Sequence, residues 1–274
     1  MGAEGKRAED HRPFAGDTAS FYAQYRRAYP AELVDRLGEF GCGGRGRLLD
    51  LGCGTGALLL QLVPFFGHAV GVDPEPDMLR EAGRATRDQD FEKVEWIRGS
   101  SAELQALAPP LGRFDLVTIG TAFHFMEPAA TLSELQRIAA GGVVAVAYNG
   151  TPMWLHPDPW AKELRRVLEN RFGPLQDADF TAEALRAAEE TMNALGYTQV
   201  GRWERTYVET IDVDFVVGHI FSATSVDQIP LAQRQDFARE VSSAIATVAP
   251  SGRVDEPVSV RAVIGRPHRD PPRR

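Results

Sequence analysis

The chain has 274 residues, of which 43% are hydrophobic and 25% are charged, the composition of an ordinary globular protein. Its formal net charge of −8, with no lysine and arginine cluster inside the globular part, argues against a nucleic-acid partner. No apolar run approaches the roughly 20 residues that span a bilayer, so we expect no membrane partner either.

The cysteine and histidine content narrows the class of protein further. Two cysteines, Cys42 and Cys53, are too few for a disulfide framework, and the first residues lack the apolar segment of a secretory signal. We therefore expect a cytoplasmic protein. The six histidines form no close pair at metal-ligand spacing, so no metal site is expected.

The first half of the chain alternates short apolar runs with amphipathic ones. Residues 1–17 are expected to be flexible and residues 18–44 to form N-terminal lid helices, one of them from Pro30 to Phe40. The pattern then predicts helices at 57–66, 76–86 and near 132–138. Strands are expected at 47–51, 68–73, 94–99, 114–120 and 143–148.

The second half has a different pattern. We expect helices at 159–172, 181–197 and 231–248, the second with Thr181 as its N-cap and Gly196 as its terminator. Strands are expected at 199–211 and 258–265. The predicted domains are a ligand-binding core at 45–150, a cap and acceptor region with an added strand at 151–250, a final core strand at 251–265 and a flexible tail at 266–274.

Continuous β-branched runs separated by helices indicate a parallel sheet that is covered on both faces. The predicted fold is therefore α/β and doubly wound. Its mostly parallel sheet has seven strands, because two antiparallel strands are added at one edge. A helical cap is inserted in the C-terminal half, over the ligand side.

The stretch "LLDLGCGTG" at 48–56 places three glycines at alternate positions after a strand and before a helix. Such a turn lets the backbone approach a ligand closely. The dinucleotide pattern G-x-G-x-x-G fails here, because Ala57 stands where its third glycine would be. Asp50 would repel a pyrophosphate by about 4 kcal/mol at a separation of 4 Å and an effective dielectric of 20, but it would attract a cationic amine. S-adenosylmethionine fits, because it carries an ammonium and a sulfonium but no phosphate.

"LLDLGCGTG" resembles the first motif of class I S-adenosylmethionine-dependent methyltransferases, which are Rossmann-like. "VGVDPEPDML", "GSSAEL" and "FDLVTIGTAFHFME" resemble later motifs of that family, so the resemblance covers residues ~18 to ~148. It implies that Asp73 binds the ribose hydroxyls and that "GSSAEL" borders the adenine. The cofactor-binding residues it implies are Tyr25, Arg26, Asp50, Gly52, Cys53, Gly54, Gly56, Asp73, Pro74, Met78, Ser101, Ala102, Glu103 and Thr121.

"FYAQYRRAYP" and "TAFHFME" are similar to motifs of a bacterial small-molecule subgroup that carries "FYxxYRxxYP" and "AFHW". In that subgroup the N-terminal segment folds over the cofactor, so Tyr25 and Arg26 are expected at the methionine carboxylate. The alternative is that the aromatic residues of this segment only pack a lid helix. The chain departs from the pattern at Arg27, where proline is common, and at Phe125, where tryptophan is common.

His124 follows the fourth strand, where the acceptor is expected to meet the methyl group, and it is the leading candidate for a general base. The alternative is a histidine that packs or orients the loop. His219 lies in the apolar stretch "FVVGHIF" and is expected to be structural. The expected acceptor-binding residues are Tyr22, Phe123, Tyr148, Asn149, Trp154 and His156.

These patterns together predict methyl transfer from S-adenosylmethionine to an oxygen or nitrogen of a small metabolite. The low lysine count and the resemblance favour bacterial (secondary) metabolism, and a monomer or homodimer is expected. Three alternatives remain: a non-methylating catalyst such as a cyclase, a protein that senses the cofactor, and a dinucleotide oxidoreductase. A nucleic-acid methyltransferase is disfavoured because "GTAFHF" stands where enzymes that methylate adenine have an Asn-Pro-Pro-Tyr-type segment.

Overall fold

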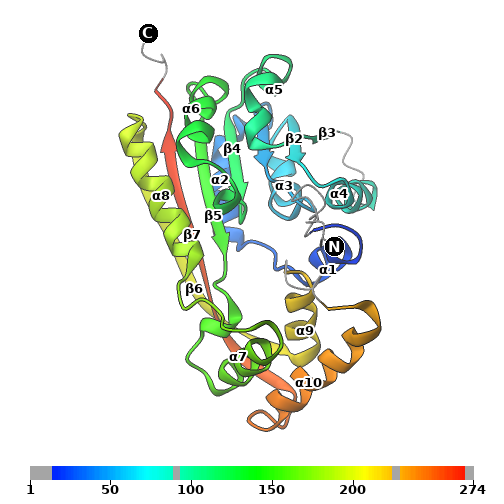
Figure 1. Cartoon of the computed structure of the whole chain (residues 1–274). Coiled ribbons are helices and arrows are strands. Elements are labelled where there is room, and N and C mark those ends of the chain that lie inside the picture. Colours follow the sequence, from blue (N-terminus) through cyan, green and yellow to red (C-terminus); the bar gives the residue numbers. More distant parts are fainter. Residues whose placement is uncertain (1–13, 89–92, 224–228, 269–274) are drawn as a thin grey trace, which may run out of the picture.

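The computed structural model describes residues 14–88, 93–223 and 229–268 and contains a seven-stranded sheet of order β3-β2-β1-β4-β5-β7-β6 (Figure 1). The parallel strands are β1 (Arg47–Leu51), β2 (His68–Asp73), β3 (Val94–Arg98), β4 (Leu116–Gly120) and β5 (Val143–Asn149). Two antiparallel strands, β6 (Thr198–Asp212) and β7 (Arg253–Arg266), extend the sheet beyond β5. This confirms the predicted doubly wound, mostly parallel α/β fold. The flexible segments expected at the two ends fall mostly at 1–13 and 269–274, outside the described residues.

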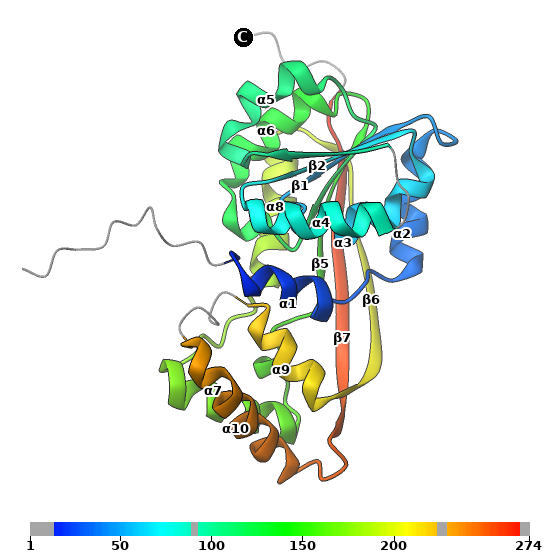
Figure 2. The same cartoon turned by 90° about the vertical axis from the view of Figure 1, so that its right-hand side faces the viewer.

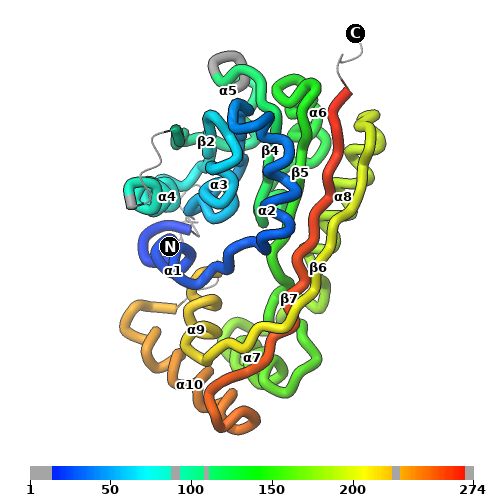
Figure 3. Tube along the Cα trace, turned by 180° about the vertical axis from the view of Figure 1, so that it is seen from behind, coloured from blue at the N-terminus to red at the C-terminus, as the bar shows by residue number. Residues whose placement is uncertain are grey.

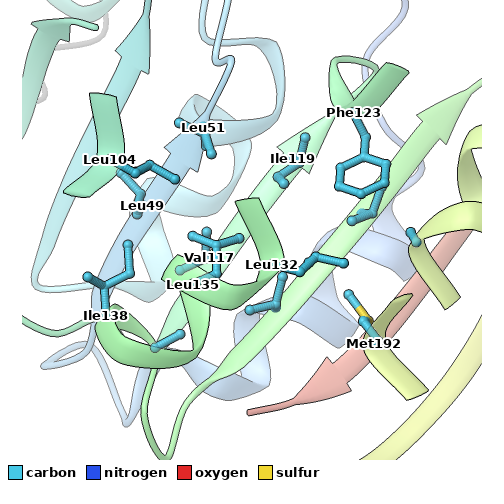
Figure 4. Close-up of a cluster of buried hydrophobic side chains, with 14 of the residues drawn as sticks. Leu49, Leu51, Leu104, Val117, Ile119, Phe123, Leu132, Leu135, Ile138 and Met192 are labelled. Atoms are coloured by element: carbon cyan, nitrogen blue, oxygen red, sulfur yellow. The ribbon is translucent and has the colours of Figure 1, made fainter. Parts of the chain in front are cut away.

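Helices cover both faces of the sheet, because successive strand residues point to opposite sides. Leu48, Ala69 and Leu116 face one side, where α2 (Ala31–Gly38) and α3 (Ala57–Leu62) pack and α4 (Pro76–Asp88) contributes Ala85. Leu49, Leu51, Val117 and Ile119 face the other side, where α5 (Leu104–Leu111), α6 (Pro128–Ile138) and α8 (Phe180–Ala194) pack (Figure 4).

A third core lies at one end of the long antiparallel pair of β6 and β7, which is connected through α9 and α10 and is called the hairpin below (Figures 2 and 3). It is built from α7 (Pro159–Phe172), α9 (Val213–Phe221) and α10 (Arg234–Ala246), with Ile211 and Val254 from the hairpin. Helix α1 (Asp17–Tyr25) lies between α4 and α9 (Figure 2). The N-terminal segment therefore joins the sheet domain to the helices at the end of the hairpin.

Two local predictions need correction. Helix α8 begins at Phe180, and its N-cap is Asp179 rather than Thr181, because the Asp179 carboxylate accepts the backbone N–H groups of Thr181 and Ala182. Helix α5 was not expected, since its sequence LQALAPPL contains two prolines. Among the described residues, no helix combines the length and apolar character needed to cross a bilayer.

Candidate active site

The turn after β1 lies close to the segment that follows β4. Gly52 has φ +70°, and a Cβ atom at this position would come within 2.6 Å of the Ala122 Cβ. Gly56 has φ +82°, and its Cβ would meet the Trp96 ring at 2.7 Å. Glycine is required at both positions for backbone conformation and for space. The turn can therefore bring its main chain to the edge of a ligand site.

Asp50 is a buried carboxylate at the end of β1, with an exposed fraction of 1%. Its Oδ1 accepts a hydrogen bond from Thr118 Oγ1 at 2.7 Å. Burial raises the pKa of Asp50 to about 7, against the lowering effect of the Thr118 bond and with a smaller upward contribution from Asp73. A cationic ligand group would stabilise the ionised form of this carboxylate.

Asp73 ends β2 and connects the glycine turn to the segment after β2. Its Oδ2 accepts the N–H of Gly54 at 2.8 Å, and its Oδ1 accepts the N–H of Glu75 at 2.9 Å. Burial raises the pKa of this carboxylate, while the two backbone bonds lower it. Each oxygen keeps a lone pair for a ligand hydroxyl, as the sequence prediction requires.

A cavity of about 490 Å³ lies beside Asp73, at the carboxyl ends of the parallel strands. This is the position where open α/β sheets bind ligands. Eight of the residues expected to bind cofactor or acceptor line it: Tyr22, Gly52, Gly54, Asp73, Pro74, Met78, Ser101 and Thr121.

Sequence reasoning missed several lining residues of this cavity. Glu75 and Arg98 stand beside the ends of β2 and β3, so the rule about strand ends could have found them. Phe14 and Phe125 also line the cavity, and their rings meet edge to face with centroids 5.7 Å apart. No local signal marks Phe14, because it reaches the site only through the position of the N-terminal segment.

A second, small cavity of about 30 Å³ adjoins the glycine turn and brings Asp50 and Arg26 together with Cys53 and Thr121 in one lining. A carboxylate and a guanidinium on the walls of one cavity suit a ligand with an ammonium and a carboxylate. The sequence predicted both groups from separate motifs.

Four residues expected at the cofactor line neither of these two cavities nor the neighbouring cavity beside His124: Tyr25, Gly56, Ala102 and Glu103. Tyr25 packs against Phe21 and Phe215, with ring centroids 6.0 and 6.2 Å away. The carboxylate of Glu103 accepts the N–H and hydroxyl of Ser100 in a capping box. Their roles at the cofactor stay predictions.

A third cavity, of about 160 Å³, lies next to the first two, on the side of α9 and the segment after β5. Four of the expected catalytic and acceptor-binding residues line it: Tyr22, His124, Asn149 and Trp154. Arg27, Phe180 and His219 also line it, although His219 was expected to be structural. These residues come from distant parts of the chain, so no local sequence pattern indicates that they share a cavity.

The other expected acceptor-binding residues lie behind this lining. Phe123 is buried in the core on the α6 and α8 face. Tyr148 is fully buried, and its hydroxyl contacts His124. His156 has its Nε2 3.8 Å from Oε1 of Glu256, and burial lowers its pKa.

Part of the chain matches a known family model and several known proteins. Residues 48–142 match the family model described as a methyltransferase domain. A probable S-adenosylmethionine-dependent methyltransferase of Saccharomyces cerevisiae is 31% identical over 108 residues, which cover 39% of this chain and 36% of the yeast protein. An uncharacterised methyltransferase of Mycobacterium tuberculosis is 30% identical over 165 residues, which cover 59% of this chain and 61% of that protein. The chain thus spans less than two thirds of either relative.

Solved structures show the same architecture. A structure from Anaeromyxobacter dehalogenans, provisionally named a type II methyltransferase, superposes with a TM-score of 0.59 and 21% identity, covering 89% of this chain and 100% of that one. The protein YcgJ of Bacillus subtilis gives a TM-score of 0.51 and 14% identity, covering 87% and 99%. At these identities the likeness concerns the fold. The chain has the class I methyltransferase fold.

S-adenosylmethionine is the cofactor of methyltransferase domains, and it supplies an activated methyl group when bound. The residues of this chain fit it on three counts. The Asp73 carboxylate suits two ribose hydroxyls, and Asp50 and Arg26 suit the amino-acid end. The cavity beside Asp73 has the size of a small-molecule site. These residues would hold the cofactor near the carboxyl ends of β1 and β2.

Proposed function

We propose that the chain transfers the methyl group of S-adenosylmethionine to an oxygen or nitrogen of a small molecule. The observation that carries the proposal is the contact between two cavities. Tyr22, Thr121 and Phe125 line both the cavity beside Asp73 and the cavity beside His124. A cofactor in the first and an acceptor in the second would be neighbours, and holding two reactants together lowers the barrier to their reaction.

The size of the cavity beside His124 supports a small acceptor. Its volume of about 160 Å³ and the aromatic rings of Phe125, Trp154 and Phe180 suit a compact organic molecule rather than a polymer. The motif "FYAQYRRAYP", the low lysine count and the mycobacterial relative support a bacterial, cytoplasmic setting in small-molecule metabolism. An acceptor cavity beside the cofactor cavity counts against a protein that only senses the cofactor.

The test is calorimetric titration of the full chain with S-adenosylmethionine and S-adenosylhomocysteine. We expect wild-type protein to bind both and Asp73→Ala to bind both about 100-fold more weakly, because two hydrogen bonds to a charged group are lost. Asp236→Ala is the matched control, since Asp236 is exposed and pairs with Arg239 in α10. Failure of the folded wild-type protein to bind either compound would refute the proposal.

A further inference from the structure

The hydrogen bonds between His124 and Tyr148 fix which ring nitrogen of His124 carries the proton. The backbone N–H of His124 donates to the Tyr148 hydroxyl oxygen at 3.0 Å, and Nδ1 of the same histidine lies 2.9 Å from that oxygen. Tyr148 is fully buried, and its hydroxyl has no other hydrogen-bond partner among the described residues. The hydroxyl hydrogen therefore goes to Nδ1, which leaves the proton of the neutral ring on Nε2.

This Nε2–H group is the one that remains for a ligand. His124 lines the 160 Å³ cavity, whereas Tyr148, which holds Nδ1, lies outside the lining. Phe125 and Phe180 flank the imidazole with ring centroids 3.9 and 4.8 Å away. Burial, with Arg26 nearby, lowers the pKa of His124 to about 4, so the ring is neutral at pH 7. His124 therefore presents a hydrogen-bond donor to the acceptor molecule, not a lone pair.

The rest of the described lining of this cavity is poor in bases. Among the described residues that line this cavity there is no Asp or Glu. Arg26 lines it with its Nε bonded to the neutral Ser222 Oγ at 2.8 Å, and no described carboxylate lies within ion-pair distance of Arg26. His219 donates Nδ1–H to the Tyr25 carbonyl at 3.3 Å, but burial and the two nearby arginines lower its pKa well below the usual value. It is therefore a weak base.

We propose that the acceptor is a carboxylic acid that is methylated on a carboxylate oxygen, which His124 holds through Nε2–H. This inference rests on the proposed function and narrows it. A carboxylate brings its own lone pair and charge: an oxygen–carbon bond forms, the carbon–sulfur bond breaks with its electrons going to sulfur, and no proton has to leave. An alcohol needs a base, and the described lining offers only His219, whose pKa is lowered well below the usual value. An amine that arrives as an ammonium would likewise have to lose a proton before it could be methylated.

Asn149 offers the acceptor cavity a second hydrogen-bonding atom, its Oδ1. Oδ1 of Asn149 is buried without a hydrogen-bond partner, while its Nδ2 donates to the carbonyl oxygens of Arg27 and Ala28 at 3.0 Å. Asn149 borders both the small cavity and the acceptor cavity. Its free acceptor oxygen suits a hydroxyl or amide N–H elsewhere on a ligand, so His124 and Asn149 offer groups of opposite polarity.

The tautomer is tested by nitrogen NMR of the full chain with 15N-labelled histidine, saturated with S-adenosylhomocysteine at pH 7. We expect the His124 ring to give the pattern of a neutral Nε2–H imidazole, assigned by loss of its signals in His124→Gln. A neutral Nδ1–H ring or an imidazolium would overturn the proposal. Saturation with S-adenosylhomocysteine is measured first, so a protein that fails to bind it fails the proposed function instead.

The acceptor class is tested on the same complex with three aromatic probes of similar size: benzoate, benzyl alcohol and benzylamine. We expect benzoate to bind at least ~10-fold more tightly than the other two and to shift the His124 Nε2–H signal, because a charge-assisted hydrogen bond forms. Equal or tighter binding of benzyl alcohol or benzylamine would overturn the proposal. So would benzoate binding that leaves the His124 signal unchanged.

Tyr148→Phe tests the positioning role of the tyrosine without removing its ring. We expect loss of the single Nε2–H pattern at His124 and at least ~3-fold weaker benzoate binding, with S-adenosylhomocysteine affinity unchanged. Tyr197→Phe is the matched control, because Tyr197 is a buried tyrosine whose hydroxyl donates to the Leu132 carbonyl at 2.8 Å, away from the cavity lining. A Tyr148→Phe protein that keeps the wild-type His124 pattern would refute the positioning role.

Discussion

At the scale of single residues, the site keeps a carboxylate where it costs stability. Asp50 has an exposed fraction of 1% and a pKa raised from 3.8 to about 7 by burial. The folded state therefore holds the Asp50 proton more tightly than the unfolded state. Between about pH 4 and pH 7 the cost of ionising this group grows with pH, and above pH 7 it is fully present. A ligand ammonium would offset that cost.

Asp50→Asn is expected to stabilise the ligand-free protein and to weaken cofactor binding. The pKa shift sets an upper limit of about 4 kcal/mol at pH 8, and we expect a gain of ~2 kcal/mol in the free energy of unfolding, since the Thr118 hydroxyl can still donate to the amide oxygen. Urea unfolding at pH 8 and pH 5 measures it. The gain should shrink at pH 5, where Asp50 is mostly protonated. Equal gains at both pH values would rule out the ionisation of Asp50 as the cause.

The positions of site residues were predictable where the neighbouring sequence fixes them. They were not predictable for residues that the fold brings in from distant parts of the chain. Asp50 and Asp73 each end a buried strand beside a turn, so the sequence places them at one edge of the sheet. His219 reaches the same cavity as His124 from α9, at the other end of the chain. Its neighbours in sequence are apolar, which is why it was expected to be structural.

At the scale of elements, Arg27 ties the N-terminal segment to the β6–β7 hairpin. Its guanidinium pairs with Glu209 of β6, at 2.5 Å, and with Glu256 of β7. The Arg27 and Glu256 side chains are 8% and 1% exposed. Burial raises the pKa of Glu256 to about 6, and Arg27 opposes the rise. Arg27, one of the two residues that depart from the subgroup motif, is thus the partner of a buried carboxylate.

Arg27→Met should destabilise the fold by about 3 kcal/mol, because it leaves Glu256 buried without its charged partner. The double variant Arg27→Met, Glu256→Gln should recover at least half of the loss, since no isolated charge remains. Urea unfolding at pH 8 gives both values. Arg239→Met is the matched control, because the Arg239 and Asp236 side chains are 72% and 70% exposed, and it should cost less than ~1 kcal/mol. A similar loss in Arg27→Met and Arg239→Met would contradict the role of the buried pair.

Elements were predictable where burial dictates the pattern. Strands β1, β2, β4 and β5 were anticipated because each is a short apolar run buried in the sheet. Strand β3 was also anticipated, although it lies at the sheet edge and is only partly buried. Ends of elements were less certain, since Asp179 and Thr181 are both good capping residues and only the fold selects Asp179. The packing of α8 on the sheet, inside the stretch expected as cap, depends on contacts with β5 and α6 that the sequence pattern does not specify.

At the scale of the whole molecule, the site lies between two bodies: the sheet domain and the group of helices α7, α9 and α10. The sheet domain supplies the strand ends, and α9 with the segment after β5 supplies the far wall of the acceptor cavity. Helix α1 contacts both α4 and α9 (Figures 1 and 2). Tyr22 from α1 lines all three cavities. A ligand in these cavities would therefore touch groups from the N-terminal segment, the sheet and the hairpin helices at once.

Binding of S-adenosylhomocysteine should accordingly order α1 and stabilise the whole chain. At a ligand concentration 100-fold above Kd the gain is about 2.7 kcal/mol, which corresponds to a rise in Tm of roughly 5–10 °C for a chain of this size. Amide hydrogen exchange with and without ligand locates the effect. We expect at least ~10-fold slower exchange in α1, whose contacts join the two bodies, because local opening must now expel the ligand. Most of α8 packs away from the cofactor cavity and is the internal control, changing only through global unfolding. Equal protection of α1 and α8 would mean that α1 does not open separately from the rest of the fold, and that the N-terminal segment does not act as a lid.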